Sequence, residues 1–399
     1  MTYAQPYSLS SVDQSVHSST GRAIPFSRPY STGREQAAIA HAIATGEMAG
    51  DGPITKRCHQ LLENELGAHK ALLTTSCTHA LEMSALLCNL QPGDEVIVPA
   101  FTFVSTANAF ALHGAKIVFA DVRRDTLNID ETQIESLITP RTRAIVPVHY
   151  AGVGCEMDAI MAIAKKHSLT VVEDNAHGLF AKYKGQYLGT IAALGTQSFH
   201  ETKNFTCGEG GALLINDQAL AERAEIIREK GTDRSRFYRG QVDKYTWRDV
   251  GSSYLPSGML AAFLFEQLSA REQIQGARKR IFDHYFEELG AWAHVNGVTL
   301  PTIPAHCDQA YHMFYMLLPS MADRAALIGH LKAAEITAPF HYVPLNISAM
   351  GQRMGGCAGM CPVTEDISDR LIRLPFFTGL TSDQQDRVID RVSSFKTRA

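Results

Sequence analysis

A lone lysine, Lys203, lies between two predicted buried strands, in the stretch SFHETKNFTCGEGG at positions 198–211. A polar run contains the lysine, and a glycine cluster follows it before the apolar run ALLIND. Glycines let a chain turn tightly and pass close to other backbone. A lysine placed this way can present its amine to a bound group at a fixed angle. A solvated lysine in a polar loop is the alternative interpretation.

A carboxylate ends another predicted buried strand. The run LTVVE is followed by DNAHG, which puts Asp174 at the strand's end and His177 three residues later. An isolated buried charge is costly, so this carboxylate needs a partner. The N–H of a pyridinium ring is one such partner, and a structural cap or salt bridge is the other interpretation.

Two further stretches carry groups suited to a planar, phosphorylated ligand. KALLTT is followed by SCTHALE, which places Ser76, Cys77 and Thr78 where a strand turns into a helix. Free N–H groups at a helix N-terminus bind anions, most often phosphate; alternatively, Thr78 only caps the helix. In FTFVSTANA, Phe103 is either a core side chain or a flat face for a planar cofactor.

The elements that must position these residues form an alternating pattern from about residue 33 to 230. Short apolar runs (DEVIVPA, AKIVFADV, RAIVPVHY, LTVVEDN) are separated by helical segments such as EMDAIMAIAKKH. This pattern predicts a buried parallel sheet in an α/β fold. Such sheets bind ligands at the carboxyl ends of their strands, so the four stretches above are predicted to meet at one edge.

A phosphate turn, an aromatic ring, a buried acid and a lysine at one sheet edge together predict a pyridoxal 5'-phosphate (PLP) site. The lysine amine bonds covalently to the cofactor's aldehyde carbon. The acid keeps the ring nitrogen protonated, which makes the ring an electron sink.

Length and composition narrow the class of protein. The 399 residues suggest two domains after a flexible tail at 1–23. The large domain is expected at 24–290 and ends in a long helical region from about 257. A smaller C-terminal α/β domain is expected at 291–399. The net charge of −4 comes without a basic cluster, so no nucleic-acid partner is expected.

The sequence predicts a cytoplasmic protein that binds no membrane. It contains neither an apolar run of about 18 residues nor, at the N-terminus, the apolar core of a signal peptide. The eight cysteines are scattered, as is typical of reduced thiols in the cytosol. We expect no metal site.

Five long stretches carry a resemblance: GDEVIVPAFTFVSTANAF, VPVHYAGVGCEMD, SFHETKN, GEGGALLIND and RGQVDKYTWRDVGSSYL. From Ile24 onward the chain resembles the sugar aminotransferases of the DegT/DnrJ/EryC1/StrS family. The resemblance implies the type I, aspartate aminotransferase-like fold of PLP enzymes. In that fold a large domain with a mostly parallel mixed sheet binds the cofactor, and a smaller C-terminal domain follows.

The resemblance also implies roles for individual residues. Lys203 binds the cofactor and moves protons, and Asp174 pairs with the ring nitrogen. The remaining implied contacts are His177 to the ring hydroxyl, Phe103 stacked on the ring, and Cys77, Thr78 and Ser198 on the phosphate. The stretch 234–254 is expected to reach a partner subunit, with Ser253 at that subunit's phosphate, so a homodimer with shared sites is implied.

The implied reaction moves an amino group from L-glutamate to a dTDP-sugar nucleotide, dTDP-4-keto-6-deoxy-D-glucose, for a cell-surface polysaccharide or a secondary metabolite. Enterobacterial common antigen and the O-antigen of lipopolysaccharide are the polysaccharide candidates. Several positions depart from the common family pattern and keep another keto-sugar nucleotide open as substrate: Ser253, Leu255, Gly258, Leu260, Asn346 and the stretch EDNAH.

Two other functions fit the sequence less well. A dehydratase built on the same scaffold carries histidine at the lysine position, which Lys203 argues against. A non-catalytic PLP-binding regulator needs a DNA-binding domain, for which the Ser-rich residues before Ile24 are too few.

Overall fold

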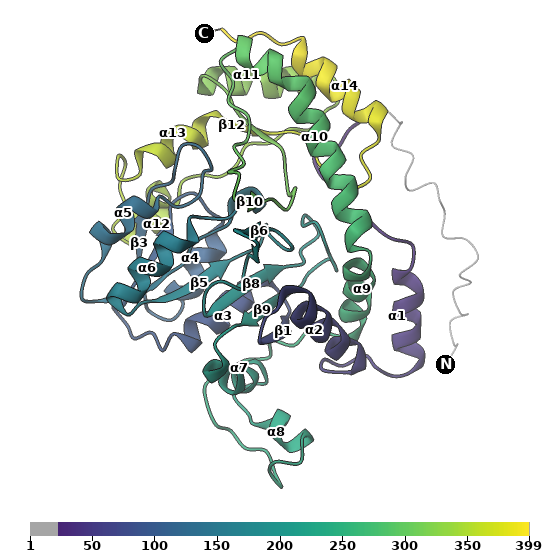
Figure 1. Ribbon diagram of the computed structural model, residues 1–399, viewed down its shortest axis with the longest axis vertical. Helices are drawn as coiled ribbons and strands as arrows, with labels where there is room; N and C mark the ends of the chain where they lie inside the picture. The colour runs from purple at the N-terminus through teal and green to yellow at the C-terminus, as the bar shows by residue number, and fades with distance from the viewer. Residues whose placement is uncertain (1–22, 399) are drawn as a thin grey trace, which may run out of the picture.

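The computed structural model describes residues 23–398, so nearly all of the predicted tail at 1–23 lies outside the described residues. A seven-stranded sheet forms the centre of the molecule (Figure 1). Its strands, in spatial order, are β1 (Lys70–Thr74), β9 (Gly211–Ile215), β8 (Leu194–Ser198), β5 (Thr170–Asp174), β4 (Thr142–Ile145), β2 (Glu95–Pro99) and β3 (Lys116–Ala120).

The sheet is mixed but mostly parallel. Strands β8, β5, β4, β2 and β3 run parallel to one another, whereas β9 pairs antiparallel with both β1 and β8. The predicted apolar runs are therefore strands, and the fold class of an α/β aminotransferase is confirmed.

Helices cover both faces of the sheet because its strands are apolar on both sides. Val96 and Val98 pack toward one core with α3 and α4, while Ile97 between them packs toward another core with α6. The helices around the sheet are α1 (Glu35–Ala44), α2 (Pro53–Leu66), α3 (Cys77–Leu87), α4 (Val104–Ala111), α5 (Glu131–Ile134), α6 (Met157–His167), α7 (Ala221–Arg228), α8 (Arg234–Tyr238) and α9 (Gly258–Ser269).

The predicted helical region from about 257 is two helices. Helix α9 ends at Ser269, and Ala270 leaves helical geometry (φ −96°, ψ 20°) before α10 (Arg271–Val295) begins. Helix α10 leads to the C-terminal part, which contains β11 (Tyr315–Leu317), α11 (Met321–Lys332), α12 (Ala349–Arg353), α13 (Pro362–Arg370), β12 (Leu371–Arg373) and α14 (Ser382–Ser393). A small sheet of β10 (Cys307–Asp308), β6 (Lys182–Tyr183) and β7 (Gln186–Tyr187) joins the two parts.

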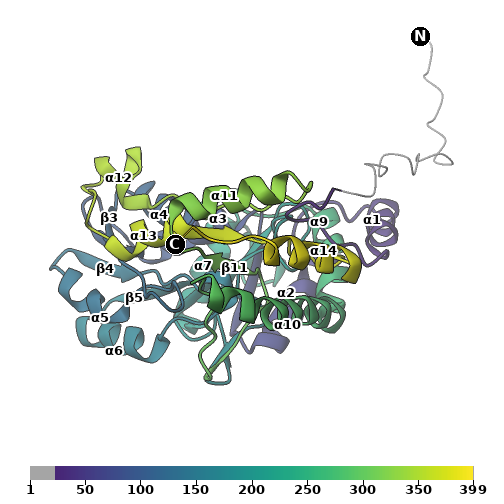
Figure 2. The same cartoon turned by 90° about the horizontal axis from the view of Figure 1, so that it is seen from above.

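The C-terminal part has its own core, which includes one residue from the start of the chain. Ile24 pairs with Ile336 and packs among the buried side chains of α10, α11 and α14. In the other direction, Leu345 and Cys361 pack into the core of the large sheet. Figure 1 places α11 and α14 above the large sheet, and in Figure 2, seen from above, the two helices lie in front of it.

No helix within residues 23–398 is long and apolar enough to cross a membrane.

Candidate active site

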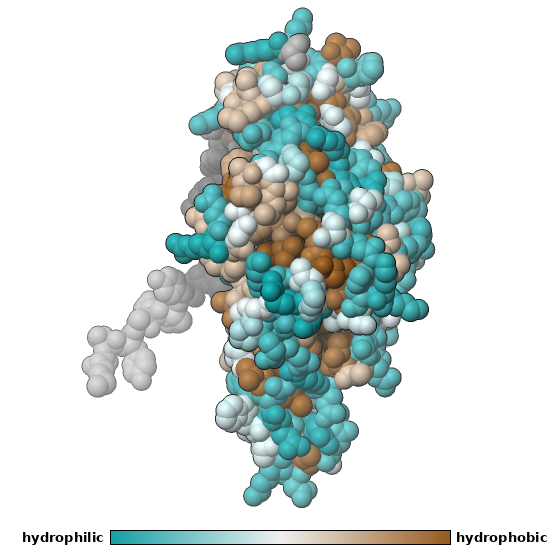
Figure 3. Space-filling view, turned by 90° about the vertical axis from the view of Figure 1, so that its left-hand side faces the viewer, coloured by the Kyte–Doolittle hydropathy of each residue, from teal (hydrophilic) through white to brown (hydrophobic). Residues whose placement is uncertain are grey.

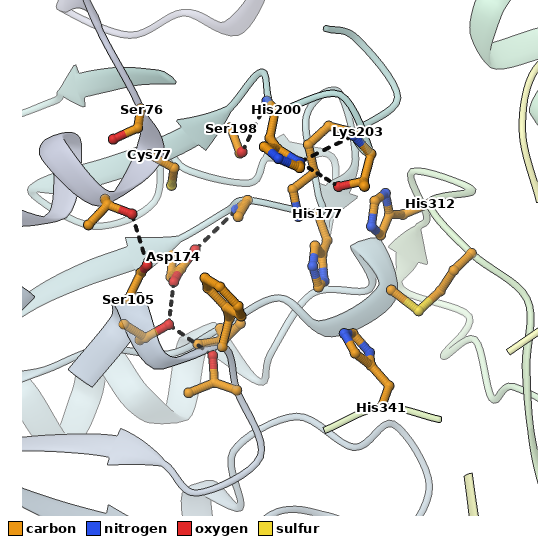
Figure 4. Close-up of a pocket in the computed structure, with 18 of the residues that line it drawn as sticks. Ser76, Cys77, Ser105, Asp174, His177, Ser198, His200, Lys203, His312 and His341 are labelled. Atoms are coloured by element: carbon orange, nitrogen blue, oxygen red, sulfur yellow. Dashed lines mark hydrogen bonds between the residues drawn. The ribbon is translucent and has the colours of Figure 1, made fainter. Parts of the chain in front are cut away.

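A cavity of about 630 Å³ opens where the parallel strands end. Its walls come from the segments that follow β1, β2, β5 and β8, from the C-terminal part, and from the segment before α1. Seven of the eight predicted site residues line it: Cys77, Thr78, Phe103, Asp174, His177, Ser198 and Lys203. Figure 4 shows side chains from these separate elements pointing toward one space.

Asp174 lies at the floor of this cavity with both carboxylate oxygens engaged. Thr106 Oγ1 donates to Oδ2 at 2.7 Å, and the backbone N–H of Ala176 donates to Oδ1 at 3.2 Å. Burial raises the pKa of the carboxyl, and these donors only partly offset the shift. A cationic N–H delivered by a ligand would relieve that penalty.

Lys203 lies in the turn after β8, where its backbone N–H donates to the carbonyl of His200 at 2.9 Å. Burial lowers the pKa of its amine to about 8, the charge of Asp174 opposes the shift, and Arg373 adds to it. Near pH 8 roughly half of the molecules therefore carry a neutral, nucleophilic amine, whereas an ordinary lysine is almost fully protonated. The neutral fraction rises with pH.

The start of α3 lines the cavity and could hold an anion through its free N–H groups. Ser76, not Thr78, caps the helix: its Oγ accepts from the N–H of His79 at 3.1 Å. Thr78 Oγ1 instead hydrogen-bonds Ser105 Oγ at 2.8 Å. The N–H groups of Cys77 and Thr78 stay unsatisfied by the helix itself, as first-turn donors do.

The glycine cluster after Lys203 has a steric reason. A Cβ on Gly211 would lie 2.4 Å from the backbone nitrogen of Cys77, so β9 can pass the start of α3 only with glycine there. Gly208 has a φ of +83°, which other residues rarely adopt. The prediction that these glycines permit close backbone approach is confirmed.

Histidines and aromatic rings form the remaining wall. His177 stacks on His312 with ring centroids 4.3 Å apart, and His177 Nδ1 is buried with no hydrogen-bond partner among the described residues. Burial lowers the pKa of both imidazoles well below the usual value, so both are neutral at pH 7. Phe103 is 57% exposed at the cavity wall rather than a core residue.

Sequence reasoning missed four residues of the cavity: Thr106, His312, His341 and Arg373. Thr106 lies in the same stretch as Phe103, in the first turn of α4, and was readable as a polar side chain in the segment that follows β2. The other three come from the C-terminal part, where strands are short. The rule that ligands bind at the carboxyl ends of parallel strands therefore gave no signal there. Ser253 is exposed and does not line this chain's cavity.

The residues present fit PLP. One cavity contains four separate features. They are the Lys203 amine with its lowered pKa, the Asp174 carboxylate without a cationic hydrogen-bond donor, the unpaired Nδ1 of His177, and the N-terminus of α3. In the same order, these features are chemically complementary to the aldehyde, the ring nitrogen, the ring hydroxyl and the phosphate of PLP.

The comparisons with known proteins decide the family. Residues 29–393 match the DegT/DnrJ/EryC1/StrS aminotransferase family. The chain belongs to this family. The spore coat polysaccharide biosynthesis protein SpsC of Bacillus subtilis is 31% identical over 377 residues, 92% of this chain and 96% of that protein. An uncharacterised protein of Methanocaldococcus jannaschii is 35% identical over 352 residues, 86% of this chain and 90% of that one.

Solved structures agree with the family assignment. A putative sugar aminotransferase of Streptococcus pneumoniae, in its PLP form, superposes with a TM-score of 0.86 at 26% identity, covering 93% of this chain and 98% of that one. A PMP form of the same protein is also similar. This DegT/DnrJ/EryC1/StrS family member is therefore a PLP-dependent sugar aminotransferase, and PLP is its cofactor.

Proposed function

We propose that the chain transfers the amino group of L-glutamate to C4 of dTDP-4-keto-6-deoxy-D-glucose. The products are dTDP-4-amino-4,6-dideoxy-D-galactose and 2-oxoglutarate. The observation that carries the transamination is the Lys203 amine, whose pKa is lowered to about 8 in the same cavity as the buried Asp174. The choice of sugar is supported by the sequence resemblance to dTDP-4-amino-4,6-dideoxygalactose transaminases, in stretches that include RGQVDKYTWRDVGSSYL.

In this proposal each residue has one task. Bound PLP supplies the electron sink that carries the amino group between the two substrates. Lys203 Nζ holds the resting cofactor, takes the proton from the donor's α-carbon and returns it on the cofactor side. Asp174 keeps the ring nitrogen protonated. The other contacts are His177 to the ring hydroxyl, Phe103 against the ring face, and Cys77, Thr78 and Ser198 around the phosphate.

Three of the departures from the common family pattern, at Gly258, Leu260 and Asn346, lie away from the cavity. Asn346 is fully buried, and its Nδ2 donates to the carbonyl of Cys357 and to Glu365. A Cβ on Gly258 would lie 2.0 Å from the carbonyl oxygen of Glu47, so packing requires glycine there. Neither residue lines the cavity, nor does Leu260. These positions support roles in packing rather than a change of substrate.

Product analysis tests the substrate and the stereochemistry. With L-glutamate and dTDP-4-keto-6-deoxy-D-glucose, we expect one aminated sugar whose proton spectrum has the small H3–H4 coupling of an axial C4 amine. A large coupling would mean the gluco product, and amination only of a 3-keto or UDP-linked sugar would move the enzyme to another substrate. Either result would leave the aminotransferase assignment standing.

We also propose a cytoplasmic homodimer whose arm reaches the neighbouring subunit. Residues 229–253 form an arm that projects below the sheet around α8 (Figure 1). The arm exposes large side chains, with Trp247 80% and Tyr238 68% accessible. Figure 3 shows this lower projection as mostly hydrophilic, with a few isolated hydrophobic residues. Exposed aromatics of this kind mark protein interfaces, and Ser253 at the arm's base is free to meet a partner's phosphate.

The dimer can be checked by sedimentation equilibrium of the PLP-loaded protein. We expect twice the chain mass of 43.7 kDa. Trp247→Ser and Tyr238→Ser together should shift the equilibrium toward single chains and lower activity in proportion. A fully active single chain would contradict the proposal.

A further inference from the structure

An asparagine directly after Lys203 ties the lysine's turn to two other parts of the molecule. Asn204 is buried and does not itself line the cavity. Its side-chain Nδ2 donates to the carbonyl of Ala310 at 2.7 Å and to Gln275 Oε1 at 3.3 Å. Ala310 precedes β11 in the C-terminal part, and Gln275 lies on α10. The backbone next to the reacting amine is therefore held from outside the sheet.

The same side chain fixes the position of the proton on a cavity histidine. Because Nδ2 faces the carbonyl oxygen of Ala310, the Asn204 amide is oriented with Oδ1 toward His312, 2.9 Å from its Nδ1. An amide oxygen only accepts hydrogen bonds, so Nδ1 of His312 carries the proton. Burial lowers the pKa of His312 well below its usual value, so the ring is neutral and its Nε2 carries no proton.

The backbone of His312 is fixed as well. Arg278 of α10 is buried, and its Nη2 donates to the carbonyl of His312 at 2.5 Å. Its Nε donates to the carbonyl of Tyr311 at 2.9 Å. His312 is therefore held at its main chain by Arg278 and at its ring by Asn204, and it lines the cavity in one orientation.

His177 stacks on this fixed ring. The two imidazole centroids lie 4.3 Å apart with planes 16° from parallel, and Figure 4 shows the two rings side by side. Nδ1 of His177 is buried without a hydrogen-bond partner among the described residues. Because His312 donates its ring proton to Asn204, only His177 of the stacked pair has a proton available to a ligand.

We propose that Asn204 is a positioning residue for the cofactor site. It fixes the ring and the tautomer of His312, and the stacked pair in turn holds His177 where its N–H reaches the ring hydroxyl of PLP. This inference rests on the His177 contact proposed above and adds the residues that orient it. Partners of this kind touch no ligand themselves and set the geometry of the side chains that do.

The absorbance of the PLP-loaded protein as a function of pH tests the effect on the cofactor. An N–H donated to the ring hydroxyl draws electron density from the ring, so its loss should make the lysine-bound nitrogen more basic. For Asn204→Leu, and also for His177→Phe, we expect the pH midpoint of the yellow band to rise by roughly half a unit or more. PLP should also bind roughly 3- to 10-fold more weakly, as the loss of one hydrogen bond implies.

Two comparisons separate positioning from general support of the fold. Asn346→Leu is the matched control, because Asn346 is also buried and its Nδ2 also donates to a carbonyl, that of Cys357, away from the cavity. This control should lower the thermal stability as Asn204→Leu does and leave the pH midpoint unchanged. In the His177→Phe background, Asn204→Leu should add almost no further shift, since both substitutions act through one contact.

Nitrogen NMR spectra of the histidine side chains report the tautomer directly and need no turnover. The His312 signals are assigned from their absence in His312→Phe. In the wild type we expect a protonated Nδ1 and an unprotonated Nε2 on His312. In Asn204→Leu we expect a mixture of the two tautomers, because nothing then holds the proton on Nδ1.

Three outcomes would overturn the proposal: a wild-type His312 with its proton on Nε2, an unchanged pH midpoint in Asn204→Leu, or an equal shift for that variant with and without His177. A holoenzyme with the expected tautomer and midpoints that does not respond to L-glutamate would instead refute the proposed function. The two failures are therefore distinguishable.

Discussion

Lys203→Ala is expected to lower transamination by more than about 10³-fold, because it removes both the covalent attachment and the proton-transfer group. The amine it removes is the one whose pKa is lowered to about 8 inside the cavity. Steady-state turnover with L-glutamate and the keto-sugar nucleotide measures the effect. Lys56→Ala, at an exposed lysine on α2, is the control and should keep full activity.

A folding defect must be separated from this loss. The folded state lowers the pKa of Lys203 below the usual lysine value of 10.5, so burying the ammonium opposes folding at any pH below that value. Removing the amine should therefore leave the cofactor-free protein at least as stable as the wild type at pH 7, as thermal unfolding would report. A variant with native stability and near-normal turnover would contradict the assigned role.

Asp174→Asn is the second large effect, with an expected loss of about 10² to 10⁴-fold in turnover. The amide keeps the shape of the side chain and can still accept from Thr106, which donates at 2.7 Å in the wild type. It cannot carry the negative charge that holds a proton on the cofactor's ring nitrogen. Both half-reactions should slow together, because both depend on the same electron sink.

Substitutions at Thr106 test the same carboxylate through its hydrogen bond, without changing Asp174 itself. Thr106→Ser keeps the hydroxyl and should stay within about threefold of the wild type, whereas Thr106→Val removes a donor whose bond lowers the pKa of Asp174. The valine variant should fall between the wild type and Asp174→Asn. An Asp174→Asn variant as active as the wild type would mean that this carboxylate is structural only.

The rule that parallel sheets bind ligands at the carboxyl ends of their strands located most of the site from sequence. Asp174, Phe103 and the Ser76–Thr78 turn each follow an apolar run, and the structure brings all of them to one cavity. Strand β8, with the sequence LGTQS, is buried although most of its residues are not apolar, and Gln197 Oε1 in it accepts from Asn175 at 3.2 Å. The glycines that follow Lys203 were therefore the stronger sequence signal there.

Contacts between distant segments could not be predicted from local pattern. The hydroxyl that holds Asp174 comes from a residue 68 positions away, and the ring that stacks on His177 lies in the C-terminal part. Ile24 pairs with Ile336, so the start of the chain packs with the end, which no periodicity indicates. Thr78 and Ser76 both fit the sequence pattern of a helix cap, and only the geometry at His79 distinguishes them.

The absorbance spectrum of the purified, PLP-loaded protein tests the central claim most directly. We predict a yellow, lysine-bound cofactor whose band gives way to that of the PMP form on addition of L-glutamate and returns on addition of dTDP-4-keto-6-deoxy-D-glucose. A protein that stays colourless after incubation with PLP, or a yellow band that glutamate leaves unchanged, would contradict the account.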